Sequence, residues 1–287
     1  MIIDKLFESV KNKGHVCLGL DTDISYIPEK FYNKYESITD AIFEFNKKII
    51  DETLDVAACF KVQIAYYEAY GLKGLEAYKK TLDYLRNEKA IIVADIKRGD
   101  IAKTAEMYAK AHFEGDFESD FVTLNPYMGF DTIEPYLPYI KEKEKGAFIL
   151  VRTSNPGSKH IQYLETGNER VYDVVGNKIN EIGKQYLGGH GYSSIGSVIG
   201  GTTAFEGQEI RNKLDSTFFL IPGYGAQGGT AKEVAEYLKK GNGAIVNSSR
   251  GILQAYKKDE NGENNFQKSA RKAAVQMRDD ILSAIGD

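Results

Sequence analysis

Short apolar runs alternate with longer amphipathic stretches along the whole chain. The apolar runs are rich in β-branched and aromatic residues and are bounded by turn-forming residues, as β-strands are. They are apolar throughout and do not alternate with polar residues, which predicts strands that are covered on both faces of a sheet. The predicted strands are His15–Leu20, Val56–Val62, Ala90–Asp95, Phe121–Leu124, Ala147–Val151, Ser197–Ile199, Thr217–Ile221 and Gly243–Asn247.

The stretches between these runs repeat apolar residues at the spacing of an amphipathic helix. Strands that alternate with helices form βαβ units around a parallel sheet, and eight such strands close a (β/α)8 barrel. We therefore predict an α/β fold, a TIM barrel, with residues 1–287 in a single domain. The predicted helices are Tyr35–Thr53, Gly74–Arg86, Ile101–Phe113, Asp131–Lys143, Val171–Tyr186 and Ala231–Lys239.

Each end of the chain adds a helix to this barrel. A polar loop, Tyr256–Phe266, precedes a predicted C-terminal helix, Gln267–Ile285. No linker, low-complexity tract or internal repeat divides the sequence between the two ends. At the N-terminus five apolar residues recur at helical spacing, namely Ile2, Ile3, Leu6, Phe7 and Val10.

Composition and charge narrow the function classes. The 287 residues carry a formal net charge of −4 without a basic block, which argues against a nucleic-acid-binding protein. Cys17 and Cys59 lie in apolar runs and read as buried thiols in a reducing compartment. The four histidines show no ligand spacing, so no zinc site is predicted.

The N-terminus lacks the features of a signal peptide, and no segment approaches the ~18 apolar residues of a membrane span. We expect a cytoplasmic protein.

Polar residues follow nearly every predicted strand. The C-terminal ends of barrel strands meet at one rim, where barrel enzymes place their chemistry. These polar residues should therefore form a ring around one mouth of the barrel. In chain order they are Asp21, Lys61, Asp95 with Lys97, Asn125, Thr153 to Asn155, Pro222 with Gly223, and Asn247 to Arg250.

The segment Asp95-Ile96-Lys97-Arg98-Gly99-Asp100 has the most specific pattern in the chain. Residues two apart in an extended strand share a face about 6.5–7 Å apart, so Asp95 and Lys97 can both face the barrel mouth beside Lys61. Charges there need partners, and an alternating cluster of lysines and aspartates supplies them and builds a preorganised field. A purely structural ion pair is the alternative, with Asp100 as the N-cap of the following helix.

A glycine-rich turn follows the seventh predicted strand, in Ile221–Gly229. It contains G-x-G-x-x-G, but the turn follows the wrong strand and lacks the later acidic residue of a dinucleotide-binding fold. Barrels often build a phosphate site from the loops after strands seven and eight. Backbone N–H groups of the turn, the Gln227 amide and the Arg250 guanidinium would suit that role. A mobile turn with a surface arginine is the alternative.

The segment DIKRGDIAKT resembles the D-x-K-x-x-D-I-x-x-T signature of orotidine 5′-monophosphate decarboxylases. Further matches follow the order of that family and cover nearly the whole chain. The length and the tyrosine-rich insertions resemble its longer bacterial and protozoan branch. The matching segments are GLD, FKVQ, VTLNPYMG, TSNPG, PGYGAQGG and NSSRGI.

This resemblance implies decarboxylation of orotidine 5′-monophosphate to UMP, the final step of de novo UMP biosynthesis, without a metal or cofactor. It implies that Lys61, Asp95, Lys97 and Asp100 form a charged network. Within it, Lys97 stabilises and then protonates the carbanion at C6 of the pyrimidine.

The resemblance also assigns substrate contacts. It places Asp21 and Lys61 on the ribose hydroxyls, Ser154 on the amide edge of the pyrimidine and Pro222 near the base. The phosphate falls to Gln227, Arg250 and the backbone near Ser249. The family's sites lie at a homodimer interface, so the partner subunit would supply Asp100, Ile101 and Thr104. Gln63 and Asn125 are carried over as further site residues.

Two other readings remain. A sugar-phosphate decarboxylase or epimerase on a related barrel shares D-x-K-x-x-D but uses magnesium with acidic ligands, so insensitivity to EDTA separates the two. The Ser154 and Gln227 patterns favour the nucleotide enzyme. A non-catalytic nucleotide-binding protein with the same barrel would usually have lost one of the four charged residues, and all four are present here.

Overall fold

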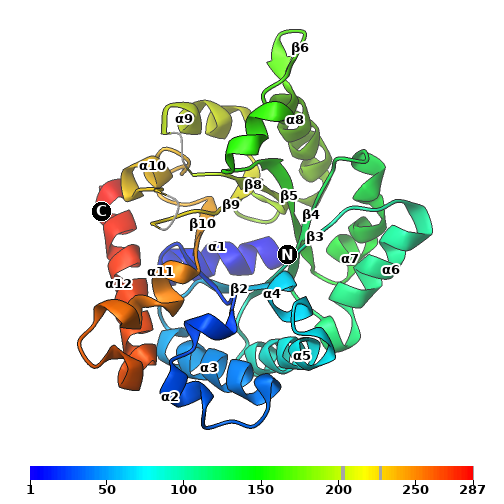
Figure 1. Ribbon diagram of the computed structural model, residues 1–287. Helices are drawn as coiled ribbons and strands as arrows, with labels where there is room; N and C mark the ends of the chain where they lie inside the picture. The colour runs from blue at the N-terminus through cyan, green and yellow to red at the C-terminus, as the bar shows by residue number, and fades with distance from the viewer. Residues whose placement is uncertain (202–203, 226–227, 287) are drawn as a thin grey trace.

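Eight parallel strands close into a barrel at the centre of the molecule (Figure 1). The computed structural model describes residues 1–201, 204–225 and 228–286. Around the barrel the strand order is β1-β10-β9-β8-β5-β4-β3-β2, and each neighbouring pair is parallel. All eight predicted strands are thereby confirmed. They are β1 (Val16–Gly19), β2 (Cys59–Gln63), β3 (Ile92–Arg98), β4 (Phe121–Leu124), β5 (Gly146–Arg152), β8 (Ser193–Ile199), β9 (Thr217–Ile221) and β10 (Ala244–Ser248).

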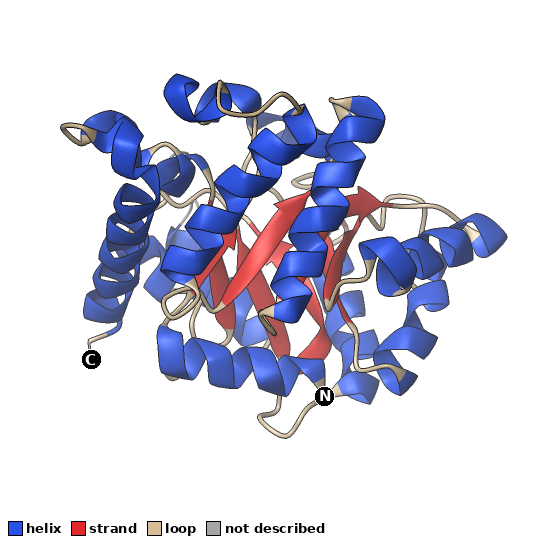
Figure 2. Cartoon of the chain, turned by 90° about the horizontal axis from the view of Figure 1, so that it is seen from below, coloured by secondary structure: helices blue, strands red, loops and turns tan. Residues whose placement is uncertain are grey.

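Helices surround the barrel on its outer side (Figures 1 and 2). Their apolar faces pack on the strands, and the combined surface forms one continuous buried cluster. The single-domain barrel of the sequence analysis is the architecture observed. The helices are α1 (Ile2–Lys13), α2 (Glu29–Tyr32), α3 (Ile38–Thr53), α4 (Ala65–Glu68), α5 (Gly71–Asn87), α6 (Ala102–Phe113), α7 (Leu137–Glu142), α8 (Val171–Gly183), α9 (Ala204–Lys213), α10 (Ala231–Ala235), α11 (Arg250–Leu253) and α12 (Phe266–Ile285).

The N-terminal helix α1 closes one end of the barrel. Its buried residues Ile2, Ile3, Leu6 and Val10 belong to a second apolar cluster with residues from the starts of the strands, such as Phe121. This closed floor leaves the opposite rim, at the carboxyl ends of the strands, for function. None of the helices in the described ranges is long and apolar enough to cross a membrane.

The predicted helix Asp131–Lys143 is wrong as a continuous element. The segment consists of two 3₁₀ turns, Phe130–Thr132 and Glu134–Tyr136, followed by the short helix α7. Pro135 and Pro138 explain the interruption, because a proline has no N–H for the helical ladder and constrains the residue before it.

Other elements differ from the predictions in extent. The predicted helix Ala231–Lys239 ends at Ala235, and Tyr256–Phe266 contains two 3₁₀ turns, Ala255–Lys258 and Gly262–Asn265. Helix α9 was not predicted. A small antiparallel hairpin, β6 (Glu165–Thr166) and β7 (Glu169–Arg170), projects from the loop after β5 (Figure 1).

Candidate active site

A cavity of about 470 Å³ opens at the carboxyl ends of the strands. Apart from Asn125, the ring of polar residues expected from the sequence lines it, and so do apolar side chains from the strands, such as Leu150, Val198 and Leu220. Of the predicted site residues, the cavity brings together Asp21, Lys61, Asp95, Lys97, Ser154, Pro222, Ser249 and Arg250.

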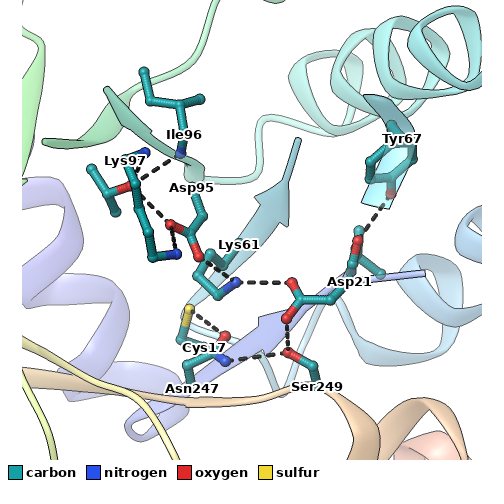
Figure 3. A network of polar contacts seen from close by, with 11 residues as sticks. Cys17, Asp21, Lys61, Tyr67, Asp95, Ile96, Lys97, Asn247 and Ser249 are labelled. Atoms are coloured by element: carbon teal, nitrogen blue, oxygen red, sulfur yellow. Dashed lines mark hydrogen bonds and ion pairs between the residues drawn. The ribbon is translucent and has the colours of Figure 1, made fainter. Parts of the chain in front are cut away.

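Alternating charges form a continuous chain across the cavity (Figure 3). The Lys61 ammonium lies 2.8 Å from Asp21 Oδ1 and 3.0 Å from Asp95 Oδ2. The Lys97 ammonium lies 2.6 Å from the other oxygen of Asp95. The order is therefore Asp21, Lys61, Asp95, Lys97. Lys61 is almost fully buried within this chain, whereas the Lys97 side chain is 45% exposed toward the cavity.

Burial and pairing determine how this cluster ionises. Burial alone would lower the pKa of Lys61, but the carboxylates of Asp21 and Asp95 raise it well above its ordinary value. Burial likewise opposes ionisation of Asp95, yet Lys61 and Lys97 lower the pKa of this carboxyl well below its ordinary range. Lys61 is therefore held as an ammonium and Asp95 as a carboxylate at neutral pH, although both side chains are buried.

The β1 end of the chain of charges is fixed by β10 and the turn after it. The Ser249 hydroxyl donates to Asp21 Oδ2 at 2.8 Å, and the Asn247 amide donates to Ser249 Oγ at 3.2 Å. A Cβ added at Gly19 would lie 1.9 Å from Ser249 Oγ. Glycine at this position thus lets the end of β1 approach Ser249, which places Asp21 beside Lys61.

Arg250 also lines the cavity, at the start of α11. Pro222, Gly223 and Tyr224 from the turn after β9 line the same region. A guanidinium beside a glycine-containing turn is suited to a phosphate group. Gln227, which the sequence assigns to the same phosphate, lies outside the described residues.

Ser154 sits in a turn after β5 that other side chains hold in place. The Gln162 amide accepts from the Thr153 N–H and donates to the Thr153 hydroxyl, each at 2.8 Å. A Cβ added at Gly200 would lie 2.9 Å from the Ser154 nitrogen, so the end of β8 approaches this turn closely. The position fits a residue that recognises a polar edge of a ligand.

The segment Asp100, Ile101 and Thr104 is not brought to the cavity within one chain. Among the described residues, the lining of the cavity does not include these three. Asp100 Oδ1 accepts from the Ile101 N–H at 2.8 Å, and the N-cap of α6 is Ile101 and not Asp100. Ile101 is 46% exposed, and Thr104 is also exposed. A contribution from a partner subunit stays a prediction.

Of the two further residues carried over, Gln63 lines the cavity. Asn125 is not among the described lining residues, and its side-chain oxygen accepts from the Tyr127 N–H at 3.0 Å.

Sequence reasoning missed Thr123 and Tyr66 as lining residues, whereas Asn247 belongs to the predicted ring and does line the cavity. Burial, with the nearby Tyr26 hydroxyl and Asp21, raises the pKa of Tyr66 to about 12, so it is a neutral phenol at the cavity wall. The one available signal for Tyr66 was its position shortly after the end of β2. In the described part of the chain, no group of three or more histidine, cysteine, aspartate or glutamate residues is placed to hold a metal ion.

Comparisons with known proteins agree with this geometry. Residues 14–264 match the model of the orotidine 5′-phosphate decarboxylase / HUMPS family. The orotidine 5′-phosphate decarboxylase of Clostridium acetobutylicum is 71% identical over 99% of this chain and 100% of its own length. The one of Clostridium perfringens strain SM101 is 68% identical over 99% of each chain. Among solved structures, the OMP decarboxylase of Leishmania donovani is similar with a TM-score of 0.79 and 27% identity, over 100% of this chain and 99% of that one.

Proposed function

The chain belongs to the orotidine 5′-phosphate decarboxylase / HUMPS family, and we propose how the residues at its barrel mouth carry out the family's decarboxylation. The protein is a carboxy-lyase that converts orotidine 5′-monophosphate into UMP in pyrimidine biosynthesis. Relatives with that name match it over nearly the full length of both chains. The observation that carries the mechanistic proposal is the chain of charges Asp21, Lys61, Asp95 and Lys97 in the cavity.

The reaction breaks the bond between C6 of the pyrimidine and the carboxylate carbon. CO2 leaves, and the electron pair of that bond remains on C6, where no neighbouring group accepts it. The Lys97 ammonium faces the cavity, so it stabilises this developing charge by proximity. It then transfers a proton to C6, which completes UMP and leaves a neutral amine that solvent reprotonates.

Asp95 and Lys61 prepare Lys97 for this role. The Asp95 carboxylate holds the Lys97 ammonium at 2.6 Å, which fixes the position of the group that transfers the proton. Lys61 neutralises the other oxygen of Asp95 and fixes it in the cavity. Because the protein has already oriented these charges, little reorganisation is needed as the transition state forms.

Contacts away from C6 supply binding free energy. In the proposed complex, Asp21 and Lys61 bind the ribose hydroxyls, Ser154 binds the amide edge of the base, and Pro222 packs near the base. Arg250 holds the phosphate together with the backbone near Ser249 and with Gln227. Binding free energy from such remote groups can hold the substrate carboxylate against Asp95 and so favour its departure.

We propose that the reaction needs no metal ion. Lys61 and Lys97 already neutralise Asp21 and Asp95, the carboxylates to which a divalent cation in this cavity would bind. A divalent cation bound there would have to displace both ammonium groups. Turnover is therefore expected to be unchanged by EDTA.

The test is a spectrophotometric assay with orotidine 5′-monophosphate and EDTA. Loss of the orotate absorbance, with UMP as the product, is expected for the wild type. Lys97→Ala should lower kcat by at least about 10³-fold and leave UMP binding nearly unchanged. A surface lysine in an ion pair, Lys79, provides the control Lys79→Ala. Turnover of Lys97→Ala within tenfold of the wild type would reject the role assigned to Lys97.

We further propose a homodimer in which each cavity is completed by Asp100, Ile101 and Thr104 of the partner subunit. Exposed apolar residues near this segment, Met107, Tyr127 and Met128, support an interface on this side of the barrel. The Cys17 and Cys59 thiols are free and buried, in keeping with the reducing cytoplasm that we propose as the place of action.

Hybrid dimers test the shared site. Lys97→Ala and Asp100→Asn subunits are each inactive alone, but their heterodimer has one site with both lesions and one intact site. An equimolar mixture should recover about one quarter of the wild-type turnover, because half of the dimers are hybrids with one working site each. Mixing Lys97→Ala with Lys61→Met, two lesions in the same subunit's half of the site, is the control that should recover none. Equal recovery in both mixtures, or none in either, rejects the shared site.

A further inference from the structure

Lys97 occupies a strained backbone conformation. Its φ is 47°, in the left-handed region that costs a residue with a side chain about 1–2 kcal/mol. The strain lies within a bulge between β3 and β4. Ala94 pairs with Val122 and Arg98 pairs with Leu124, so three residues of β3 lie opposite the single residue Thr123. Such a conformation persists only where the surroundings hold it.

The Thr123 hydroxyl holds all three bulged residues. Its oxygen accepts from the Ile96 N–H at 3.0 Å and from the Lys97 N–H at 2.9 Å. The hydroxyl donates to Asp95 Oδ1 at 2.8 Å. A hydroxyl offers one proton and two lone pairs, so its hydrogen-bonding capacity is fully used. Thr123 is 1% exposed, and water has little access to replace it.

The same hydroxyl acts on both ends of the Lys97 side chain. It fixes the backbone from which that side chain starts, and it fixes the carboxylate oxygen to which the ammonium donates at 2.6 Å. Asp95 Oδ1 is held by the Thr123 hydroxyl and the Lys97 ammonium together, while its Oδ2 is held by Lys61.

We propose that Thr123 is a positioning residue for the decarboxylation, because its hydroxyl sets the place from which Lys97 delivers its proton to C6. This inference rests on the role proposed for Lys97. Without the hydroxyl, the N–H groups of Ile96 and Lys97 lose their acceptor, and the bulge can relax towards a regular strand. The ammonium would then move with the backbone, and a displacement of about 1 Å at a reacting group can cost about 10²-fold in rate.

The variants are Thr123→Val, which has nearly the same shape without the hydroxyl, and Thr123→Ser, which keeps the hydroxyl. Thr53→Val is the matched control, since the Thr53 hydroxyl is also buried but donates to Ile49 O within α3. We expect Thr123→Val to lose about 10²-fold in kcat with KM changed less than threefold. Thr123→Ser should stay within tenfold of the wild type, and Thr53→Val should keep full kcat.

A second readout follows the proton itself. In D2O the enzyme should exchange the C6 proton of UMP for deuterium by the reverse of the protonation step, which NMR can follow. Thr123→Val should slow this exchange by about the same factor as kcat. A merely structural role of Thr123 would lower the melting temperature and leave the exchange rate per folded molecule unchanged.

The outcomes separate this inference from the proposed function. If Lys97→Ala keeps its turnover, the role of Lys97 fails first. If Lys97→Ala is inactive but Thr123→Val keeps kcat and exchange, the positioning role alone is overturned. It is also overturned if Thr123→Ser falls as far as Thr123→Val. Should Thr123→Val not fold, Thr123→Ser and Thr123→Cys decide, because kcat must then fall with the weaker donor while KM is retained.

Discussion

Lys61 tests whether the chain of charges behaves as one electrostatic unit. The substitution Lys61→Met keeps most of the side chain's length and removes its ammonium. Asp21 and Asp95 then face each other without the cation that lies between them, at 2.8 and 3.0 Å. Their side chains are 12% and 7% exposed, so water cannot fully replace Lys61.

The size and pH dependence of the effect follow from this burial. Removing one partner of a buried ion pair costs about 3–5 kcal/mol in the free energy of unfolding. The variant can reduce this cost by binding a proton, which raises the pKa of one carboxyl above its value in the unfolded chain. In the wild type the pKa of Asp95 is instead lowered from 3.8, so its contribution is fully present above about pH 4 and constant between pH 5 and 8.

The two proteins should therefore diverge as pH rises. The variant gains up to about 1.4 kcal/mol of stability per pH unit as pH falls below the raised pKa, and the wild type gains nothing from Asp95 there. Urea unfolding at pH 5, 6, 7 and 8, at one protein concentration, measures the difference. Lys145→Met is the control, because the partner of Lys145, Glu118, is 42% exposed. A penalty below 1 kcal/mol, or one that does not change with pH, would refute the reasoning.

Three further predictions concern residues around the barrel. Buried Arg211 donates to backbone carbonyls, including Gly243 O at 2.9 Å, and its guanidinium lies 3.5 Å from the centre of the Phe219 ring. Arg211→Met should therefore lower the free energy of unfolding, measured in urea, by at least about 3 kcal/mol, and a loss below 1 kcal/mol contradicts this. Gly200→Ala adds a methyl group 2.9 Å from the Ser154 nitrogen, so it should displace the turn that carries Ser154. We expect kcat/KM to fall at least about tenfold while the circular dichroism spectrum stays unchanged. Unchanged kinetics would show that the close approach of Gly200 does not position Ser154. Burial, and then Arg98, lower the pKa of His112 from 6.5 to about 4, so the free energy of unfolding of the wild type falls as pH drops from 6.5 to 4. Over that range His112→Leu should lose up to about 3 kcal/mol less of its free energy of unfolding than the wild type does. If urea unfolding gives both proteins the same dependence of this free energy on pH, this explanation is excluded.

The barrel was readable from the sequence because its strands are buried on both faces. Continuous apolar runs such as Phe121–Leu124 have few other structural solutions between amphipathic helices. Element ends were less well predicted. Helical spacing persists through Asp131–Lys143, but the backbone cannot follow it past two prolines. Helix α9 was not predicted because its apolar and polar residues are not separated onto two faces. One of the residues that attach it to the rest of the fold is charged, since buried Arg211 donates to the Tyr237 carbonyl.

The site was predictable where function depends on charge at the end of a strand. Burying a charged side chain without a partner costs free energy. Charged residues at the ends of neighbouring strands therefore predicted that Asp95 would pair with Lys61 and Lys97. Thr123 carried no such signal, since threonine is an ordinary strand residue and its hydroxyl acquires meaning from the bulge opposite it. In the single chain Asp100 lies outside the described lining of the cavity, and the role that we propose for it needs a partner subunit.

The bulge explains why the pattern D-x-K is more than an alternation in a strand. A regular strand would direct both side chains to the same side about 6.5–7 Å apart, with the lysine free to extend away from the aspartate. In the bulge, the left-handed backbone at Lys97 lets the ammonium return to 2.6 Å from Asp95 while the side chain stays 45% exposed to the cavity. The backbone strain thus lies at the bulge, where β3 departs from regular strand geometry. Hydrogen bonds from the Ile96 and Lys97 N–H groups to Thr123 on the neighbouring strand offset it. The arrangement gives Lys97 both a fixed position and a proton that is accessible from the cavity. The reaction needs both, because the negative charge develops at a single carbon atom, C6, and the proton must be delivered to that atom.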